Sequence, residues 1–276
     1  MSPLSSQHPR GLAGLWREGV RPLVGMVHLL PLPGSPRSDG SMAAVVDRAV
    51  ADATALERGG LDGVLVENFL DAPFHPGAVP PETVAGMSVA LAAVIAAVRV
   101  PVGVNVLRND ARGALAVAAA TGARFIRVNV HTGTMWTDQG VIEGRAHETL
   151  RARRALGVDV RILADVEVKH ATPPPGYDLE DAARDAWTRG LADALLVTGP
   201  ATGAPADPAV CRRVRSAAPD APVWLASGVT PTTVAAALEA ADGVIVGSAL
   251  CSGGVAGAGV DPGRVDELAA AARRAT

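Results

Sequence analysis

The residues best suited to chemistry lie in the stretch 160–170, which reads V-R-I-L-A-D-V-E-V-K-H. Apolar, β-branched residues give way there to two carboxylates, a lysine and a histidine, as expected where a buried strand ends at a site. Because side chains alternate along a regular strand, Asp165, Glu167 and Lys169 would all point the same way. Lys169 is the only lysine in the chain. Unlike an arginine, a desolvated lysine can lose its proton or form a Schiff base.

Polar residues also close most of the other apolar stretches, where parallel strands would end at one common edge. His28 could act as a general acid or base near neutral pH, and Glu67 could pair with Lys169. Asn105 and Asn129 suit hydroxyl or carbonyl groups, although a buried amide pair or an ordinary loop anchor would look the same. The predicted catalytic set is Lys169, Asp165, Glu67 and His28, and the predicted substrate-binding set is Asn105, Asn129, His131, Glu167, His170 and Thr198.

The elements that must position these residues alternate between short apolar strands and Ala-rich amphipathic helices. This alternation predicts an α/β fold, a single (β/α)8 TIM barrel of eight parallel strands with eight outer helices. An open doubly wound sheet is the alternative, but no G-x-G-x-x-G follows the first strand. The expected strands are 23–28, 62–67, 101–106, 124–130, 159–167, 193–198, 222–227 and 243–248, and the expected helices are 42–59, 84–98, 111–121, 145–156, 179–190, 207–217, 231–241 and 262–275.

A single domain accounts for the whole pattern, because no linker interrupts the alternation. We expect the barrel domain at 21–276, after an N-terminal segment at 1–20. Three long strand-to-helix connections, at 69–83, 131–144 and 170–177, leave the face where barrel enzymes keep their sites.

Two Gly-Ser turns follow the seventh and eighth expected strands, in A-S-G-V-T (226–230) and V-G-S-A (246–249). Barrel enzymes frequently bind phosphate after these strands, with backbone N–H groups directed at the anion. Glycine leaves room for a close approach, although two ordinary tight turns would give the same pattern. The predicted phosphate-binding residues are Ser227, Gly228, Gly247 and Ser248.

A divalent cation is a further alternative at the strand ends. Glu67, Asp165 and Glu167 supply oxygen ligands of the kind that Mg²⁺ prefers. These residues match no tight ligand motif. The sequence therefore requires no cofactor and leaves a metal such as Mg²⁺ open.

Composition restricts the partners and the compartment. Hydrophobic residues make up 49% of the 276 residues, enough for a large core, and the net charge of -3 gives no footprint for nucleic acid. No apolar run reaches the roughly 20 residues of a membrane span. Cys211 and Cys251 are far apart and match no metal spacing, which favours free thiols. We expect a cytoplasmic homo-oligomer that binds a phosphorylated small molecule.

The longer motifs run in order along the expected barrel: G-M-V-H-L-L-P-L-P-G (25–34), D-G-V-L-V-E-N-F-L-D-A-P-F (62–74), V-P-P-E-T-V-A-G-M (79–87), G-V-N-V-L-R-N-D (103–110), F-I-R-V-N-V (125–130), T-D-Q-G-V-I-E-G (137–144), A-D-V-E-V-K-H-A (164–171), T-G-P-A-T-G (198–203) and S-G-V-T (227–230). In this order they resemble the BtpA family, whose members include proteins linked to photosystem I biogenesis and to sugar operons. The resemblance implies a ribulose-phosphate-binding type of barrel. It does not imply a particular reaction, because the family has no established one. After the eighth strand the family tends to carry a lysine in a G-x-x-L-K segment, whereas this chain has Cys251. The change weakens electrostatic support for a phosphate there.

Three hypotheses of function follow. The first is lyase or isomerase chemistry on a phosphorylated sugar-like or nucleoside-like molecule, with Lys169 as nucleophile, general base or fixed cation. The second is the making or breaking of a glycosidic bond on a ribosyl phosphate, with Asp165 and Glu67 stabilising an oxocarbenium-like transition state. The third is a non-catalytic assembly or biogenesis factor, which would have little need for acids and a lysine at its strand ends.

Overall fold

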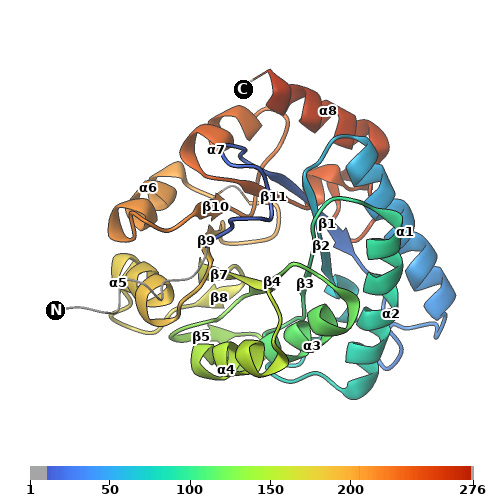
Figure 1. The fold of residues 1–276 in the computed structure, drawn as a ribbon, viewed down its shortest axis with the longest axis horizontal. Coiled ribbons are helices and arrows are strands. Elements are labelled where there is room, and N and C mark those ends of the chain that lie inside the picture. The colour runs from blue at the N-terminus through green and yellow to red at the C-terminus, as the bar shows by residue number, and fades with distance from the viewer. Residues whose placement is uncertain (1–10, 205, 275–276) are drawn as a thin grey trace.

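A closed barrel of parallel strands forms the centre of the molecule, and helices surround it (Figure 1). The structure, a computed structural model, describes residues 11–204 and 206–274. The strands follow the order β1-β11-β10-β9-β7-β4-β3-β2 around the barrel, which confirms the predicted fold. Their bounds are β1 (Leu23–His28), β2 (Gly63–Glu67), β3 (Val102–Asn105), β4 (Phe125–Val128), β7 (Arg161–Glu167), β9 (Ala194–Val197), β10 (Val223–Leu225) and β11 (Val244–Val246).

Outer helices follow the strands as expected. Their bounds are α1 (Met42–Arg58), α2 (Pro81–Ala97), α3 (Ala111–Thr121), α4 (Ala146–Leu156), α5 (Leu179–Arg184), α6 (Pro208–Ala217), α7 (Val234–Ala240) and α8 (Pro262–Arg273). Within residues 11–204 and 206–274, no helix combines the length and the apolar character needed to cross a bilayer.

Three helices depart from the expected ranges for local reasons. α2 begins three residues earlier, because Pro81 suits the first turn of a helix. α7 begins later, because residues 230–233 form a turn in which the Thr230 N–H donates to Thr233 Oγ1 at 2.9 Å. α5 is short and continues as one π-helical turn, Asp185–Arg189.

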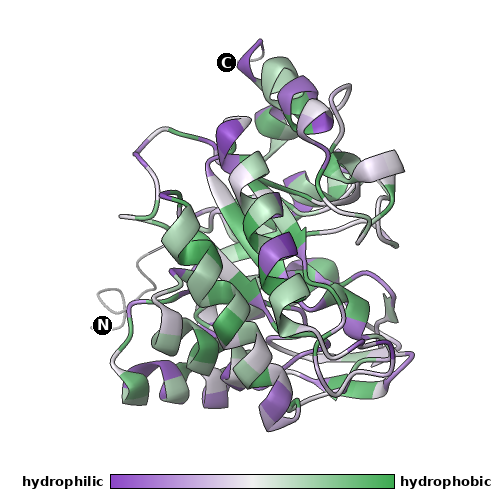
Figure 2. Ribbon diagram, turned by 90° about the vertical axis from the view of Figure 1, so that its right-hand side faces the viewer, coloured by the Kyte–Doolittle hydropathy of each residue, from purple (hydrophilic) through white to green (hydrophobic). Residues whose placement is uncertain are grey.

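Side chains of the barrel strands alternate between two packing layers. Outward-facing residues such as Val64 and Ile126 join the helices in the larger core. Inward-facing residues such as Met26, Phe125 and Trp224 fill the barrel itself. Hydrophobic colour accordingly runs through the central strands, whereas the helices and loops carry much of the hydrophilic colour (Figure 2).

The segment before β1 closes the bottom of the barrel. Trp16 packs its ring against Trp224 and Phe125, with centroid distances of 5.2 and 5.8 Å. Its indole N–H donates to the carbonyl oxygen of Asp62 at 2.8 Å, which fixes the ring at the start of β2. Residues 1–10 of the expected N-terminal segment lie outside the described residues.

A small sheet at the top of the barrel was not expected from the sequence. The connection at 131–144 folds into a hairpin of β5 (Thr134–Thr137) and β6 (Gly140–Glu143). β8 (Ala171–Thr172), from the loop after β7, pairs with β5 in antiparallel register. We call these three strands the loop sheet. It joins the loops that follow β4 and β7, so the end of β7 is held from above.

Gly103 is expected to tolerate no side chain, because its position lies inside the filled barrel. A Cβ atom at Gly103 would sit 2.2 Å from the Phe125 ring, whereas at Gly77 it would meet nothing within 4 Å. Overpacking a closed core costs about 1–3 kcal/mol. We predict that Gly103→Ala lowers the free energy of unfolding by at least about 1 kcal/mol in urea denaturation, and that Gly77→Ala changes it by less than about 0.5 kcal/mol. Equal effects would show that the barrel interior is loosely packed.

Candidate active site at the mouth of the barrel

The predicted catalytic and phosphate-binding residues meet at the C-terminal ends of the strands. His28, Glu67 and Lys169 share one pocket with all four predicted phosphate-binding residues. We call it the inner pocket; it is narrow, with a cavity volume of about 30 Å³. It is lined by Met26, His28, Glu67, Phe69, Arg127, Lys169, Thr202, Gly203, Ala226, Ser227, Gly228, Gly247 and Ser248.

A wider cavity continues from the inner pocket toward solvent. This outer pocket has a volume of about 640 Å³. It shares Glu67, Phe69, Lys169 and Thr202 with the inner pocket. Its remaining lining residues are Arg37, Leu70, Ala72, Phe74, Leu107, Arg108, Asn129, Asp138, His170 and Ala256. Two predicted substrate-binding residues, Asn129 and His170, therefore lie in the outer pocket rather than the inner one.

Lys169 follows the end of β7, and the chain around it is held on three sides. Val168 is buried in the apolar cluster beneath the loop sheet. The carbonyl oxygen of Lys169 accepts a hydrogen bond from Arg108 Nη2 at 2.5 Å. The N–H of His170 donates to the carbonyl oxygen of Pro200, in the loop after β9, at 3.1 Å. These contacts fix the backbone from which the amine enters the pocket.

The expectation that Glu167 shares a face with Asp165 and Lys169 is wrong, because β7 is not regular. The pairing of β7 with β9 shifts register between Asp165 and Glu167, which marks a bulge. Glu167 then aligns with Val197, whose side chain packs in the outer core, and its own side chain is exposed. The Thr198 hydroxyl donates to the Glu167 carbonyl oxygen at 2.8 Å. Glu167 and Thr198 therefore hold two strand ends together and do not line either pocket.

The amine of Lys169 is poised to lose its proton. Burial lowers its pKa to about 8, with a further lowering by Arg127, while Glu67 and Asp165 act in the opposite direction. With a pKa near 8, roughly a tenth of the amine is unprotonated at pH 7. Lys169 is thus a candidate nucleophile or base at physiological pH.

Asp165 is held in a buried ion pair and does not line either pocket. Arg127 donates to both of its carboxylate oxygens, at 3.0 and 2.9 Å, and both side chains are almost fully buried. Asn129 Nδ2 adds a third hydrogen bond at 3.0 Å. The carboxylate therefore accepts three hydrogen bonds from two side chains and is paired with the charge of Arg127. In this arrangement it positions Arg127 and Asn129.

Arg127 is a site residue that the sequence analysis missed. Arg127 lines the inner pocket and follows Phe125 by two positions along β4, so both side chains are on the inner face of the strand. The alternation of F-I-R-V-N-V contains the signal, because residues two apart share one face of a strand. Arg108 was also missed. It comes after β3, where no strand pattern extends to indicate its direction.

Glu67 is held by a neighbouring amide. Asn105 Nδ2 donates to Glu67 Oε2 at 2.6 Å, from the adjacent strand in register. Asn105 does not line either pocket, and its hydrogen bond positions Glu67. Glu67 lines both pockets, and the hydrogen bond from Asn105 engages only its Oε2 atom.

His28 lines the inner pocket as a neutral imidazole. The Gly257 N–H donates to its Nδ1 at 3.3 Å, so the ring proton is on Nε2. Burial lowers the pKa of His28, although Glu67 opposes the shift. The ring packs on Phe69 with centroids 4.6 Å apart. His28 can therefore donate a hydrogen bond to a ligand more readily than it can carry a charge.

The glycine-lined wall of the inner pocket has the features expected for an anion. Gly228 adopts a φ of +68°, which favours glycine. At Gly247 a Cβ atom would lie 3.3 Å from Met26, so a side chain would crowd the pocket floor. The Ser227 hydroxyl accepts from the Gly199 N–H at 2.6 Å and donates to Ala204 at 2.9 Å. Ser227 thus ties two loops, which leaves the glycines and Ser248 to face a ligand.

Cys251, at the position where the resemblance to the BtpA family implies a lysine, does not line either pocket. Its thiol is buried, 3.9 Å from His28 Nδ1 and 3.6 Å from the Gly247 carbonyl oxygen. Burial raises the pKa of the thiol, so it stays protonated. Both cysteines are free.

The carboxylates named for a cation do not assemble, since Glu167 points away and Asp165 is paired with Arg127. Within residues 11–204 and 206–274, no group of three or more His, Cys, Asp or Glu side chains is arranged to hold a metal ion.

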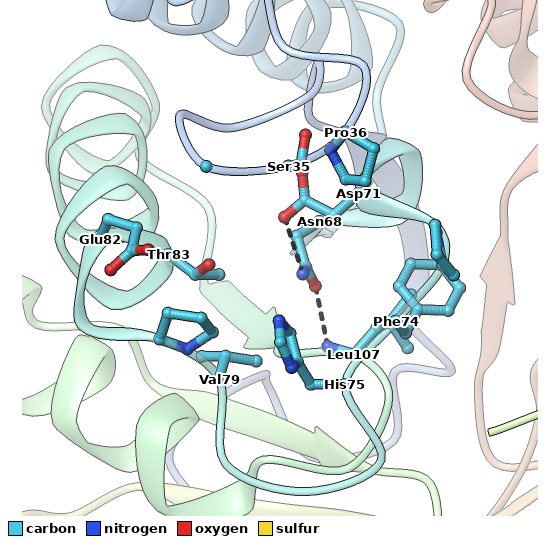
Figure 3. Close-up of a pocket in the computed structure, with 13 residues that line it drawn as sticks. Ser35, Pro36, Asn68, Asp71, Phe74, His75, Val79, Glu82, Thr83 and Leu107 are labelled. Carbon is cyan, nitrogen blue, oxygen red and sulfur yellow. Dashed lines mark hydrogen bonds between the residues drawn. The ribbon is translucent and has the colours of Figure 1, made fainter. Parts of the chain in front are cut away.

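Another pocket lies beside the barrel mouth at the start of α2 (Figure 3). Asn68 Nδ2 donates there to Asp71 Oδ2 at 3.1 Å, and the Leu107 N–H donates to Asn68 Oδ1 at 2.8 Å. Asp71 also accepts from the Leu32 N–H at 2.8 Å. These bonds join the loops after β1, β2 and β3 into one rigid unit. None of the predicted site residues lines this pocket.

His131 lies away from both pockets, contrary to its expected role in substrate binding. It is buried, its Nε2 lies 2.8 Å from the Gly190 carbonyl oxygen, and its Nδ1 has no partner among the described residues. The contact with a carbonyl oxygen places the proton on Nε2. Burial lowers the pKa of His131 to about 4. His131 is a neutral residue that fixes the start of the hairpin.

We predict that His131 makes the protein less stable in mild acid. Below pH 6.5 the unfolded chain binds a proton at His131, whereas the folded state does not until about pH 4, so stability falls as the pH drops through this window. Relative to His131→Gln, the wild type should lose roughly 2 kcal/mol of unfolding free energy between pH 7 and pH 5. His147→Gln, at a side chain that is 67% exposed, is the matched control and should follow the wild type. Parallel plots of unfolding free energy against pH for all three proteins would show that folding does not lower the pKa of His131.

Comparisons with known proteins agree with the motifs. The sequence profile of the BtpA family matches residues 19–274. The "Photosystem I biogenesis protein BtpA" of Synechocystis sp. is 50% identical over 244 residues, covering 88% of this chain and 85% of that protein. An uncharacterized protein of Pyrococcus furiosus is 45% identical over 231 residues, covering 83% of this chain and 86% of that protein.

Solved structures show the same barrel at low sequence identity. The "Native KDPGal structure" gives a TM-score of 0.56 at 18% identity and covers 94% of this chain and 96% of that one. N-(5'-phosphoribosyl)anthranilate isomerase from Pyrococcus furiosus gives 0.55 at 15% identity, covering 92% of this chain and 100% of that one. These likenesses concern the fold alone. The family profile and the two close relatives, which span nearly the whole barrel, show that the chain belongs to the BtpA family.

Proposed function

We propose that this protein is an enzyme that acts on a phosphorylated, sugar-like or nucleoside-like small molecule, with lyase or isomerase chemistry at Lys169. The observation that carries this proposal is the inner pocket. There, a lysine with a lowered pKa and a carboxylate share one cavity with two glycine turns suited to a phosphate. A phosphate bound at Gly228 and Gly247 would hold the reacting carbons beside the amine.

The chemistry follows from the unprotonated amine. Lys169 can attack a carbonyl carbon of the substrate, forming a C–N bond while the carbonyl oxygen leaves as water. The protonated imine then draws electrons from the neighbouring carbon, so a C–H or C–C bond beside it can break. Glu67, fixed by Asn105, is placed to take up or return the proton. Without a covalent step, Lys169 could instead act as a general base, or as a fixed cation when protonated.

Trapping the imine tests the covalent role. The protein is incubated with a panel of carbonyl-containing sugar phosphates and sodium borohydride, and the peptides are mapped by mass spectrometry. We expect the reduced adduct mass on Lys169, and none on Lys169→Met under the same conditions. A sugar phosphate that is turned over without any adduct on Lys169 would rule out the covalent role. The base role would then be tested by the dependence of kcat/KM on pH.

A non-catalytic role in assembly is the second candidate, and the name of the Synechocystis relative favours it. It predicts that cells carrying Lys169→Met combined with Glu67→Gln in place of the wild type keep the wild-type phenotype. The tagged double variant should also still capture a protein partner in a pull-down. Loss of cellular function in this variant, with a normal thermal unfolding temperature, would contradict the assembly role.

A further inference from the structure

We infer that the substrate also carries a planar nitrogen-containing ring with an N–H donor, and that this ring binds in the outer pocket. The inference rests on the proposed function for the phosphorylated half of the substrate. It adds the chemical class of the other half. The outer pocket supplies the observations, because a small sugar phosphate confined to the inner pocket would leave it unused.

An unsatisfied acceptor in the outer pocket indicates a donor on the ligand. Asn129 is 3% exposed, and its Oδ1 has no hydrogen-bond partner among the described residues. The amide cannot be reversed to remove this vacancy, because its Nδ2 donates to Asp165. A buried acceptor without a donor is costly unless a ligand satisfies it. A ligand that presents an N–H or O–H group at Asn129 would satisfy this oxygen.

The walls of the outer pocket favour a flat ring over a chain of hydroxyl groups. Phe69 and Phe74 line it together with Leu70 and Leu107. Aromatic side chains bind the faces of rings, and apolar ones offer nothing to a polyol. Arg108 adds a buried guanidinium, which stacks well on planar groups. Acceptor groups on Glu67, Asp138 and Asn129 line the same pocket, so its walls suit a heterocycle with an N–H on its edge.

The residues shared by the two pockets indicate where the reacting bond of the substrate would lie. Glu67 and Lys169 line both cavities, so they lie where a phosphorylated sugar in the inner pocket meets a ring in the outer one. The outer pocket is much the larger of the two, at about 640 Å³ against about 30 Å³ for the inner one, so most of a ligand that spans both would lie in the outer pocket. A phosphorylated molecule that spans both would have its central bond over the carboxylate and the amine.

Binding measurements with matched probes test the inference. Ribose 5-phosphate represents the inner half alone, and uridine and inosine 5′-monophosphates add a ring with an N–H donor. We expect the nucleotides to bind at least about tenfold more tightly than ribose 5-phosphate, from ring stacking and one buried hydrogen bond. Their N3-methyluridine and N1-methylinosine counterparts, which lack the donor, should lose about tenfold.

Two variants localise the effect. Phe74→Ala should reduce the affinity ratio of nucleotide to ribose 5-phosphate by about fivefold or more, because it removes a wall of the outer pocket. Trp136→Ala removes an aromatic side chain that is 46% exposed on β5, outside both pockets, and should leave the ratio unchanged.

The outcomes separate this inference from the proposed function. Equal binding of ribose 5-phosphate and the nucleotides would overturn the ring and leave the proposed function standing. Equal binding of uridine and uridine monophosphate would overturn the phosphate and leave the ring pocket standing. No loss on N-methylation would show that Asn129 Oδ1 does not receive the donor and would overturn the stated ring class.

Discussion

Replacing Lys169 with arginine is expected to lower kcat/KM at least about 10³-fold on the substrate that the ligand panel identifies. Arginine preserves the positive charge and much of the volume, but it cannot lose its proton near neutral pH or form an imine. A fall of this size would therefore separate the chemistry of the amine from its charge. The measurement is steady-state kinetics of purified wild type and Lys169→Arg, with circular dichroism to show that both are folded. Full activity in Lys169→Arg would exclude the nucleophile and base roles together.

The pH profile of the wild type gives an independent reading of the same residue. Because the pKa of Lys169 is lowered to about 8, kcat/KM should rise tenfold per pH unit below pH 8 and level off above it. The rise belongs to the free enzyme and requires the unprotonated amine. A profile that is flat from pH 6 to pH 9 would mean that the ammonium form is the active one, as in the fixed-cation role.

Stability should change in the opposite direction from activity at this position. The ammonium is partly desolvated in the fold, and between pH 8 and pH 10.5 the unfolded chain binds a proton that the folded chain does not. Lys169→Met, which keeps the length of the side chain without the charge, is thus expected to raise the free energy of unfolding at pH 7 by about 1–3 kcal/mol. A gain of stability with a loss of activity is typical of a residue kept for function.

The barrel was predictable because each strand and helix follows from a local pattern. Mostly apolar strands of three to seven residues and the Ala-rich helices between them leave little choice of architecture. The boundaries that moved depend on single contacts, such as the Thr230–Thr233 turn before α7. The loop sheet was not predictable, because β8 is two residues long and is defined only by its pairing with β5.

The members of the candidate site were predictable in part, and the contacts of each member less so. Position at a strand end brought Glu67, Lys169 and the glycine turns together correctly. Alternation failed at Glu167, since a bulge has no signature in this stretch of sequence. Roles depend on partners from other strands: Asn105 turns out to hold Glu67. Such pairings across strands come from register, which a single sequence does not contain.

Removing Arg127 is expected to give the largest loss of stability of any substitution in the site. Arg127→Met leaves the Asp165 carboxylate buried without its counter-charge, and breaking a buried pair from one side costs about 3–5 kcal/mol. We expect this decrease in the free energy of unfolding by urea denaturation at pH 7. Arg124→Met, at an exposed arginine three residues earlier, is the matched control and should cost less than about 0.5 kcal/mol.

A double-mutant cycle shows whether the loss comes from the stranded charge. In Arg127→Met with Asp165→Asn, no charge is left unpaired, so the double variant should be more stable than Arg127→Met alone. Because Arg127 lowers the pKa of Lys169, Arg127→Met should also move the rise of the pH profile above pH 8, and the loss of Asp165 in the double variant, which acts in the opposite direction, should offset part of that shift. Additive losses in the cycle, with an unmoved pH profile, would show that Arg127 neither balances Asp165 nor tunes the amine. The expected outcome is that the Arg127 guanidinium has two roles. It balances the charge of the buried Asp165 carboxylate, and it lowers the pKa of Lys169 at the mouth of the barrel.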